Sequence, residues 1–232
     1  MSRASSPLVS VIIPAYKSEA TIGRCLDAIG RQSFRDFETI VVDSSPQDLL
    51  SELMRRKYPG VGFHHHEQRL LPHQARNWGF RSSHGSVIVF TDPDCLPEHD
   101  WLKRLMAAMH QGRAAVGGSF RSPPGWWAQS VHVSKFAWWL PGGETRRISE
   151  IPSGNAAFTR ELFERLNGYR SGWFAGDSEL CWRAVEGGEQ VWFEPRAAVT
   201  HIDSADFRCF VQERWKRGKD FGDMRSTLQQ WS

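Results

Sequence analysis

The sequence lacks the features that mark several classes of protein. Its four cysteines, spread over 232 residues, form no Cys-x-x-Cys pair, which argues against a disulfide framework and against a zinc site. No apolar run approaches the roughly 20 residues that a membrane-spanning helix needs. Residues 1–7 are Ser-rich and lack the apolar core of a secretory signal. We therefore expect a cytoplasmic protein with reduced thiols and a disordered N-terminus over residues 1–7.

A strong charge of one sign is also missing. The formal net charge is +3, which is too small to indicate a nucleic-acid partner, and we expect none. Basic residues do gather in the C-terminal segment 204–232, for which we predict a basic helix and a tail. They are Arg208, Arg214, Lys216, Arg217 and Lys219. Such a helix is either solvated or lies on an anionic membrane, here the inner face, as a peripheral contact.

Tryptophan, by contrast, is abundant. Eleven are present, and four form the doublets Trp126-Trp127 and Trp138-Trp139 within residues 121–151, a stretch interrupted by proline and glycine. We interpret this stretch as an acceptor-side loop or flap, because it is too long for a passive connection. Exposed aromatic rings stack on sugars or sit at membrane interfaces, but core packing explains them equally well.

The order of apolar patterns predicts an α/β fold. In the first half, strand-like runs at 8–13, 39–42, 61–63, 86–91 and 114–117 alternate with helical patterns at 18–30, 46–57, 71–83 and after Pro97. The second half predicts helices at 159–166, 177–186 and 205–218, with strands at 190–193 and up to residue 201. Alternation of this kind predicts a Rossmann-like, mostly parallel central sheet flanked by helices, with a smaller acceptor-side region.

Two carboxylates stand at the end of one predicted strand. The apolar run that starts at Ser86 ends in Asp92 and Asp94, separated by one proline. Ligands of open α/β sheets gather outside the carboxyl ends of the strands. Paired oxygen ligands there suit Mg²⁺ or Mn²⁺ holding a substrate diphosphate, although Asp-Pro-Asp is also good turn chemistry.

Six short motifs occur in a fixed order along residues 8–203. They are Val-Ile-Ile-Pro-Ala-Tyr (11–16), Ile-Val-Val-Asp (40–43), Gln-Ala-Arg-Asn-Trp-Gly (74–79), Asp-Pro-Asp (92–94), Asp-Ser-Glu-Leu-Cys-Trp-Arg (177–183) and His201. Together they resemble the family-2 glycosyltransferases of the GT-A fold. The resemblance implies one GT-A domain over 8–203, with a nucleotide-donor half (8–119) and an acceptor and catalytic half (120–203). It also implies an inverting, metal-dependent transfer from a nucleoside-diphosphate sugar to a hydroxyl of a glycan or lipid-linked acceptor.

The same resemblance assigns residues to the nucleoside. Pro14, Tyr16 and Glu19 would frame the base, and Asp43 would accept hydrogen bonds from the base or the ribose. Asp43 could instead cap the following helix. Many relatives carry a second Asp where this chain has Ser44, so the sequence does not fix the base.

Further residues are assigned to the diphosphate and the metal. Arg76 would reach the base or the diphosphate, or form a salt bridge with Asp92 or Asp43. Asp92 would contact the ribose or the metal, and Asp94 would ligate the metal directly. His201 would complete the metal shell, unless it is structural. We expect the run His64-His65-His66 to be solvated, because neighbouring strand residues point to opposite faces.

Asp177 is the predicted general base. Inverting transfer needs one group that takes the proton of the acceptor hydroxyl, and a carboxylate suffices. Relatives commonly read Glu-Asp here, whereas this chain reads Gly176-Asp177. An N-cap role for Asp177 is the alternative, and Glu179 is the second candidate for the base. Ser153-Gly154-Asn155 resembles the family's turn beneath donor and acceptor.

The segment Gln212-Glu213-Arg214-Trp215 is similar to the Gln-x-x-Arg-Trp of processive synthases but one residue shorter, so it does not indicate processivity. Arg214, Trp215 and Lys216 would close over the diphosphate, unless this basic helix lies on an anionic membrane or is solvated. Two other functions stay open: a noncatalytic scaffold of the same fold that binds sugar nucleotide or glycan, and a sugar nucleotidyltransferase, which shares the sheet and the acidic pair. The tryptophans beside Lys135, Arg146 and Arg147 predict a lipid-linked or otherwise partly apolar acceptor.

Overall fold

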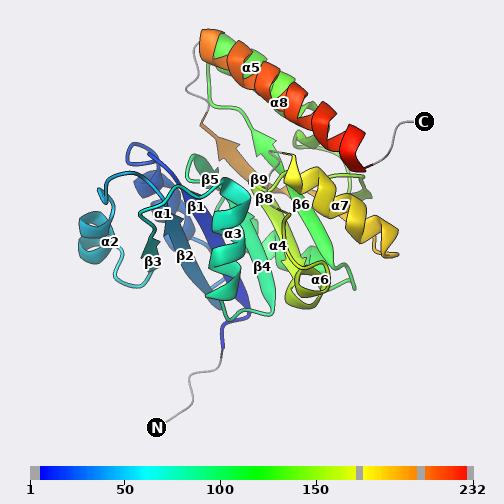
Figure 1. Ribbon diagram of the computed structural model, residues 1–232. Coiled ribbons are helices and arrows are strands. Elements are labelled where there is room, and N and C mark those ends of the chain that lie inside the picture. Colours follow the sequence, from blue (N-terminus) through cyan, green and yellow to red (C-terminus); the bar gives the residue numbers. More distant parts are fainter. Residues whose placement is uncertain (1–5, 171–174, 203–206, 229–232) are drawn as a thin grey trace.

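A computed structural model describes residues 6–170, 175–202 and 207–228, leaving aside the side chains of residues 209 and 228 (Figure 1). Most of the expected N-terminal disorder at 1–7, the expected helix start at 205 and the tail after residue 228 lie outside these ranges. No helix in the described part of the chain is both long and apolar enough to cross a bilayer.

The described strands join in one nine-stranded sheet. They are β1 (Val9–Ala15), β2 (Phe37–Asp43), β3 (Gly62–His65), β4 (Val87–Thr91), β5 (Cys95–Pro97), β6 (Ala115–Arg121), β7 (Arg146–Arg147), β8 (Asn155–Thr159) and β9 (Val191–His201). Their order is β3-β2-β1-β4-β8-β6-β9-β5, with β7 beside β9. The part formed by β3, β2, β1 and β4 is parallel, as predicted. The sheet is mixed overall, because β8 runs antiparallel to both β4 and β6.

Helices cover both faces of this sheet. They are α1 (Ile22–Gly30), α2 (Ser51–Lys57), α3 (Pro72–Arg81), α4 (Trp101–Met109), α5 (Trp126–Phe136), α6 (Arg160–Arg165), α7 (Gly176–Glu186) and α8 (Phe207–Leu228), with a short 3₁₀ turn η1 (Ala137–Trp139). In Figure 1, α3, α6 and α7 lie in front of the sheet. The α/β class predicted from the alternating pattern is confirmed.

Strand β1 shows how the sequence sorts the two faces. Val11 and Ile13 join the apolar cluster that contains residues of α1 and α4, whereas Ile12 belongs to the cluster on the α6 and α7 side. Successive strand residues point to opposite faces, so a wholly apolar strand needs helices on both sides. Helix α3 packs closely on β1, because a Cβ at Gly79 would lie only 2.5 Å from a methyl group of Ile12.

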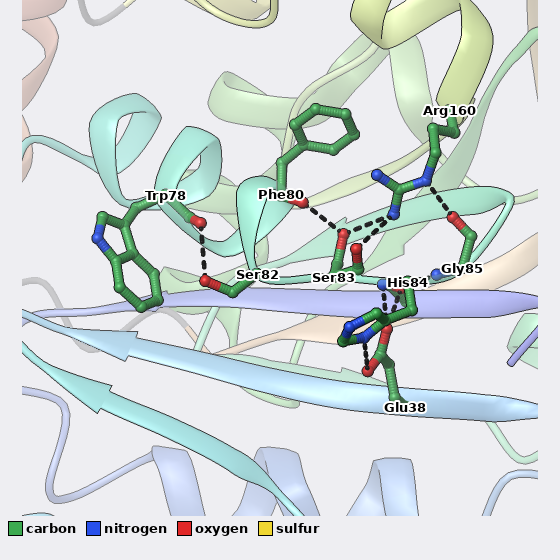
Figure 2. Close-up of polar contacts among 9 residues, drawn as sticks. Glu38, Trp78, Phe80, Ser82, Ser83, His84, Gly85 and Arg160 are labelled. Atoms are coloured by element: carbon green, nitrogen blue, oxygen red, sulfur yellow. Dashed lines mark hydrogen bonds and ion pairs between the residues drawn. The ribbon is translucent and has the colours of Figure 1, made fainter. Parts of the chain in front are cut away.

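Side chains of α6 and β2 hold the loop between α3 and β4 in place (Figure 2). The guanidinium of Arg160 donates to the carbonyl oxygens of Gly85 (2.7 Å) and Ser83 (2.9 Å), and Glu38 accepts from the amide of His84 (2.6 Å). These contacts link β2, α6 and the start of β4. They therefore help to set the position of β4, whose far end carries Asp92.

The predicted loop at 121–151 is wrong in one respect, because it contains the eleven-residue helix α5. Apolar side chains lie on both the buried and the exposed side of this helix, which obscures the helical periodicity: Val131 is buried, while Trp126 and Val133 are exposed. Helix α8 also continues ten residues beyond its predicted end at residue 218. The two strands predicted at 190–201 form one strand, β9, with an irregular register opposite Gly118.

Helices α5 and α8 pack side by side beyond one end of the sheet (Figure 1). Trp127 contacts the rings of Phe207 and Phe210, with centroids about 6 Å apart. Further along, the Lys135 ammonium lies 3.0 Å from the Glu213 carboxylate. Helices α5 and α8 lie over the edge of the sheet at which β1 and β4 end. They form one wall of the cavity described next.

Candidate active site

A cavity of about 660 Å³ lies between the strand ends and the α5–α8 pair. This volume is in the range of small-molecule sites. Eight of the eleven site residues predicted from the sequence line it. They are Pro14, Tyr16, Arg76, Asp92, Asp94, Asp177, His201 and Arg214. Residues from both halves of the chain thus meet in one place.

The first wall is formed by Asp92 and Arg76. Asp92 follows β4, and its carboxylate forms a close ion pair with the guanidinium of Arg76 from α3. Gly154 lies against the same carboxylate, since a Cβ there would be 2.7 Å from Asp92 Oδ2. Thr91 donates to the carbonyl of Gly154 at 3.0 Å, which holds the two segments together. The salt bridge that the sequence left as an alternative for Arg76 is therefore present.

Arg76 keeps hydrogen-bonding capacity beyond this ion pair. Its side chain is buried, Nη1 lies 3.4 Å from His73 Nδ1, and Nε has no hydrogen-bond partner among the described residues. A buried guanidinium N–H without an acceptor is costly. An anionic or carbonyl group of a ligand would supply that acceptor.

The second wall brings Asp94 next to His201. Cys95 is the register partner of His201 in the antiparallel pair β5–β9, and the amide of Ile202 donates to the carbonyl of Asp94 at 2.8 Å. As a result His201 Nε2 lies 3.6 Å from Asp94 Oδ2. These two groups and the Cys95 thiol all lie within 4.8 Å of one another.

This donor set fits a divalent cation. A carboxylate and an imidazole match Mn²⁺, and carboxylates also match Mg²⁺. Burial, together with the charges of Asp94 and Asp92, raises the pKa of the Cys95 thiol well above its usual value. A hard cation prefers oxygen and nitrogen donors to a thiol, so it would be held here by Asp94 and His201, with Asp92 lining the same cavity.

Asp177 stands in the first turn of α7, at the third wall. Its Oδ1 accepts from the amide of Ser178 at 3.0 Å, and its Oδ2 accepts from the amide of Ser153 at 3.3 Å. The residue that precedes α7 is Ala175, so Asp177 is not the N-cap. The carboxylate is half-buried and faces the cavity, where it can accept a proton.

Glu179, the second candidate for the base, forms ion pairs outside the cavity. It is buried, and its carboxylate contacts Arg183 at 2.6 Å and Arg170 at 3.1 Å. Arg183 in turn donates to the carbonyl of Gly168 at 2.8 Å. Glu179 therefore holds Arg170 and Arg183 and does not line the cavity.

Three predicted residues lie outside the cavity lining. The carboxylate of Asp43 is buried and is held by Ser45 (2.7 Å) and His65 (2.8 Å). Glu19 is exposed, and Trp215 lies on the outer side of α8 with 79% of its surface exposed.

The three histidines of the run 64–66 are partly buried and in contact with other side chains, whereas we expected them to be solvated. The imidazole of His65 contacts the carboxylate of Asp43. The rings of His64 and His66 pack against Trp78, with centroid distances of 4.2 and 4.7 Å. Adjacent strand residues do point to opposite faces, but here both faces are partly covered.

Sequence reasoning missed several residues of the cavity. They are Arg69, His73, Lys135, Phe136, Glu213 and Arg217. The guanidinium carbon of Arg69 lies 4.3 Å from the centroid of the Tyr16 ring. His73 stacks on Tyr169 with 4.5 Å between the ring centroids. His73 and Arg76 are three residues apart and so share a face of α3. This spacing is the one sequence signal that could have indicated His73 as a cavity residue. No local pattern marks the residues of α5.

Comparison with known proteins agrees with this architecture. Residues 10–165 match the model of Glycosyl transferase family 2, so the chain belongs to this family. The sequence is 34% identical over 119 residues to glycosyltransferase AglE of Haloferax volcanii, an alignment that covers 49% of this chain. It is 28% identical over 234 residues to the probable glycosyltransferase YdaM of Bacillus subtilis, covering 93% of this chain.

The fold also resembles a solved structure. The mannosyltransferase PcManGT from Pyrobaculum calidifontis, in complex with GDP-Man and Mn²⁺, superposes with a TM-score of 0.74 at 24% identity and covers 99% of this chain. The family and the GT-A fold expected from the six motifs are thus confirmed. The chain spans 39% and 56% of the length of AglE and YdaM, and 66% of PcManGT.

Proposed function

We propose that this chain is an inverting glycosyltransferase that moves a sugar from a nucleoside-diphosphate sugar to a hydroxyl group, with Asp177 as general base and a divalent cation bound by Asp94 and His201. The observation that carries the proposal is the meeting of three groups in one cavity: the Arg76–Asp92 ion pair, the Asp94–His201 pair and the Asp177 carboxylate. The complex of PcManGT with GDP-Man and Mn²⁺ supports both the donor class and the cation.

The proposed reaction divides the cavity between two halves of a domain over residues 8–203. Residues 8–119 would hold the donor, with Pro14 and Tyr16 at the base and Arg76 at the diphosphate. Residues 120–203 would present the acceptor. Arg214 lines the same cavity and would contribute to the diphosphate site, whereas the exposed position of Trp215 favours a different role for that residue.

Asp177 would carry the proton chemistry. As the acceptor oxygen forms its bond to the anomeric carbon, the O–H proton passes to the Asp177 carboxylate. The bond between the anomeric carbon and the phosphate oxygen breaks, and the nucleoside diphosphate leaves with the electron pair. A cation held by Asp94 and His201 would supply positive charge that offsets the charge of that leaving group. The amides of Ser153 and Ser178 hold the carboxylate so that a free oxygen lone pair is available for the proton.

The acceptor is proposed to be a glycan or a lipid-linked hydroxyl compound. The cavity is lined by Phe120 and Phe136 as well as by charged groups, so it offers apolar surface beside the polar centre. Aromatic rings of this kind stack on the apolar faces of sugars.

The test is a donor panel assayed with Mn²⁺ on wild type, Asp177→Asn and a matched control, Glu186→Gln, an exposed position on the same helix. We expect release of nucleoside diphosphate by wild type and control. Asp177→Asn should lower kcat by about 10²–10⁴-fold, the usual share of a general base, with little change in nucleotide affinity. Full activity of Asp177→Asn would reject the base assignment. Release of pyrophosphate in a parallel assay supplied with a nucleoside triphosphate and a sugar 1-phosphate would indicate a nucleotidyltransferase, and binding without turnover would indicate a scaffold.

A further inference from the structure

The outer side of the α5–α8 pair is unusually apolar for an exposed surface. Within the described residues, eight large apolar side chains are exposed, and six of them belong to α5, η1 and α8. They are Trp126, Val133, Trp138, Phe207, Val211 and Trp215. The three tryptophans each expose more than three quarters of their surface. Apolar groups concentrated in this way mark an interaction surface.

On α8 these residues follow a regular row. Phe207, Val211 and Trp215 are four residues apart and exposed, and Lys219 continues the row. The neighbouring row holds Arg208 and Lys216, which are also exposed. An apolar row bordered by basic residues is the pattern of a helix that lies in a membrane interface.

The charged residues of α8 are also unevenly distributed around the helix. The helix has six Lys or Arg residues and three Asp or Glu residues. Glu213 is turned toward Lys135 of α5 and Arg217, and Asp220 is half-buried, which leaves Asp223 as the exposed acid of the helix within residues 207–227. The outward side therefore carries mainly positive charge.

We propose that this outer surface of α5, η1 and α8 docks on an anionic phospholipid bilayer. Indole rings prefer the interfacial region of membranes, and exposed Lys and Arg attract anionic headgroups. A second copy of the chain is a poorer partner, because a two-fold symmetric contact would bring the same basic rows together.

The inner side of the same helices faces the cavity through Phe136 and Arg214. Docking would hold the cavity beside the bilayer, where an acceptor carried on a lipid can enter. This last step rests on the proposed function, whereas membrane docking itself does not.

The experiment is flotation of the full chain with vesicles of phosphatidylcholine alone or mixed with phosphatidylglycerol. The variants are Trp126→Ser with Trp138→Ser, and Arg208→Gln with Lys219→Gln. Matched controls replace the two exposed apolar residues that lie elsewhere, Leu49→Ser with Val185→Ser. A second control, Arg24→Gln with Lys103→Gln, removes exposed basic residues of α1 and α4. Circular dichroism checks that each variant is folded.

We expect wild type and both controls to bind the anionic vesicles, with binding weakened by salt. The tryptophan variant should bind at least about tenfold more weakly, since it loses interfacial aromatic area. The basic variant should lose about fivefold for each charge removed. Absence of wild-type binding, equal binding by the variants, or a dimer in sedimentation that the tryptophan variant abolishes would overturn the proposal. Asp177→Asn should bind vesicles like wild type, so a failed transferase assay and a failed docking assay are distinguishable.

Discussion

Cys95 and His201 are register partners across the antiparallel strands β5 and β9, and this pairing sets the imidazole of His201 3.6 Å from the carboxylate of Asp94. More than one hundred residues separate the two in sequence. The geometry of the proposed cation site is thus a consequence of strand pairing and does not depend on a local motif.

The first prediction concerns His201. Replacing it by Gln should weaken Mn²⁺ binding in the presence of a nucleoside diphosphate by about 10–100-fold, because a nitrogen ligand is replaced by a weaker amide. Isothermal titration calorimetry measures this affinity. His110→Gln, an exposed position directly after α4, is the control. Equal Mn²⁺ affinity in the His201 variant would show that the imidazole is structural.

The second prediction concerns Gly154. An alanine Cβ there would lie 2.7 Å from Asp92 Oδ2, so the Asp92–Arg76 pair must shift. We expect KM for the donor to rise about tenfold, since the misplaced groups contact the ligand in both ground and transition states. Gly60→Ala is a suitable control, because a Cβ at Gly60 meets nothing within 4 Å. An unchanged KM would mean that Asp92 takes no part in donor binding.

A third prediction addresses stability at the centre of the sheet. The buried side chain of Asn155 accepts from Trp101 Nε1 at 2.8 Å and donates to the carbonyls of Ser119 and Ala197 at 2.9 Å. Asn155→Ala leaves these buried groups without partners and should reduce the free energy of unfolding by about 2–4 kcal/mol. Urea unfolding checks the value, with the exposed Gln47→Ala as reference. A loss below about 1 kcal/mol would contradict this account.

The fourth prediction is a pH dependence at the α5–α8 contact. Burial acts to raise the pKa of Glu213, but the charges of Lys135 and Arg217 outweigh it, and the pKa of Glu213 is lowered below its ordinary value of 4.5. A lowered folded-state pKa stabilises the protein above the unfolded-state pKa, and that stabilisation is lost as the pH falls through the folded-state value.

Glu213→Gln should therefore be less stable than wild type at neutral pH, by about 1 kcal/mol for a partly exposed pair. The difference between the two proteins should shrink as the pH falls below about 4.5. Thermal or urea unfolding over pH 3–7 measures it, and Glu186→Gln provides the comparison. A stability difference that does not vary with pH would exclude this ion pair as the cause.

The donor half of the fold could largely be predicted from local sequence pattern. The run around Val11 to Ile13 and the one that ends at Asp92 are short, apolar and bounded by breakers, so their strands and their shared edge follow from local pattern. Helix α5 was not predicted, because apolar residues lie on both its buried and its exposed side. Its stability also depends on contacts with α8, such as that between Trp127 and Phe210.

The candidate site divides in the same way. The resemblance of the ordered motifs to family-2 glycosyltransferases singled out Asp92, Asp94, Asp177 and His201, and carboxylates and an imidazole are the groups that this chemistry needs. Their convergence on one cavity could not be read from the order, nor could the burial of Asp43 or the ion pairs that remove Glu179 from the reaction. Those depend on which distant side chains meet them.

Local pattern accounts for the set of elements and for the chemical groups at their ends, because apolar periodicity and breakers act over a few residues. Which of these groups share one cavity follows from tertiary packing. Strand pairing joined Asp94 to His201, packing of α3 joined Arg76 to Asp92, and packing of α5 on α8 left three tryptophans on the outside. Contacts between residues far apart in the chain depend on the global minimum of packing free energy, which no local window of sequence contains.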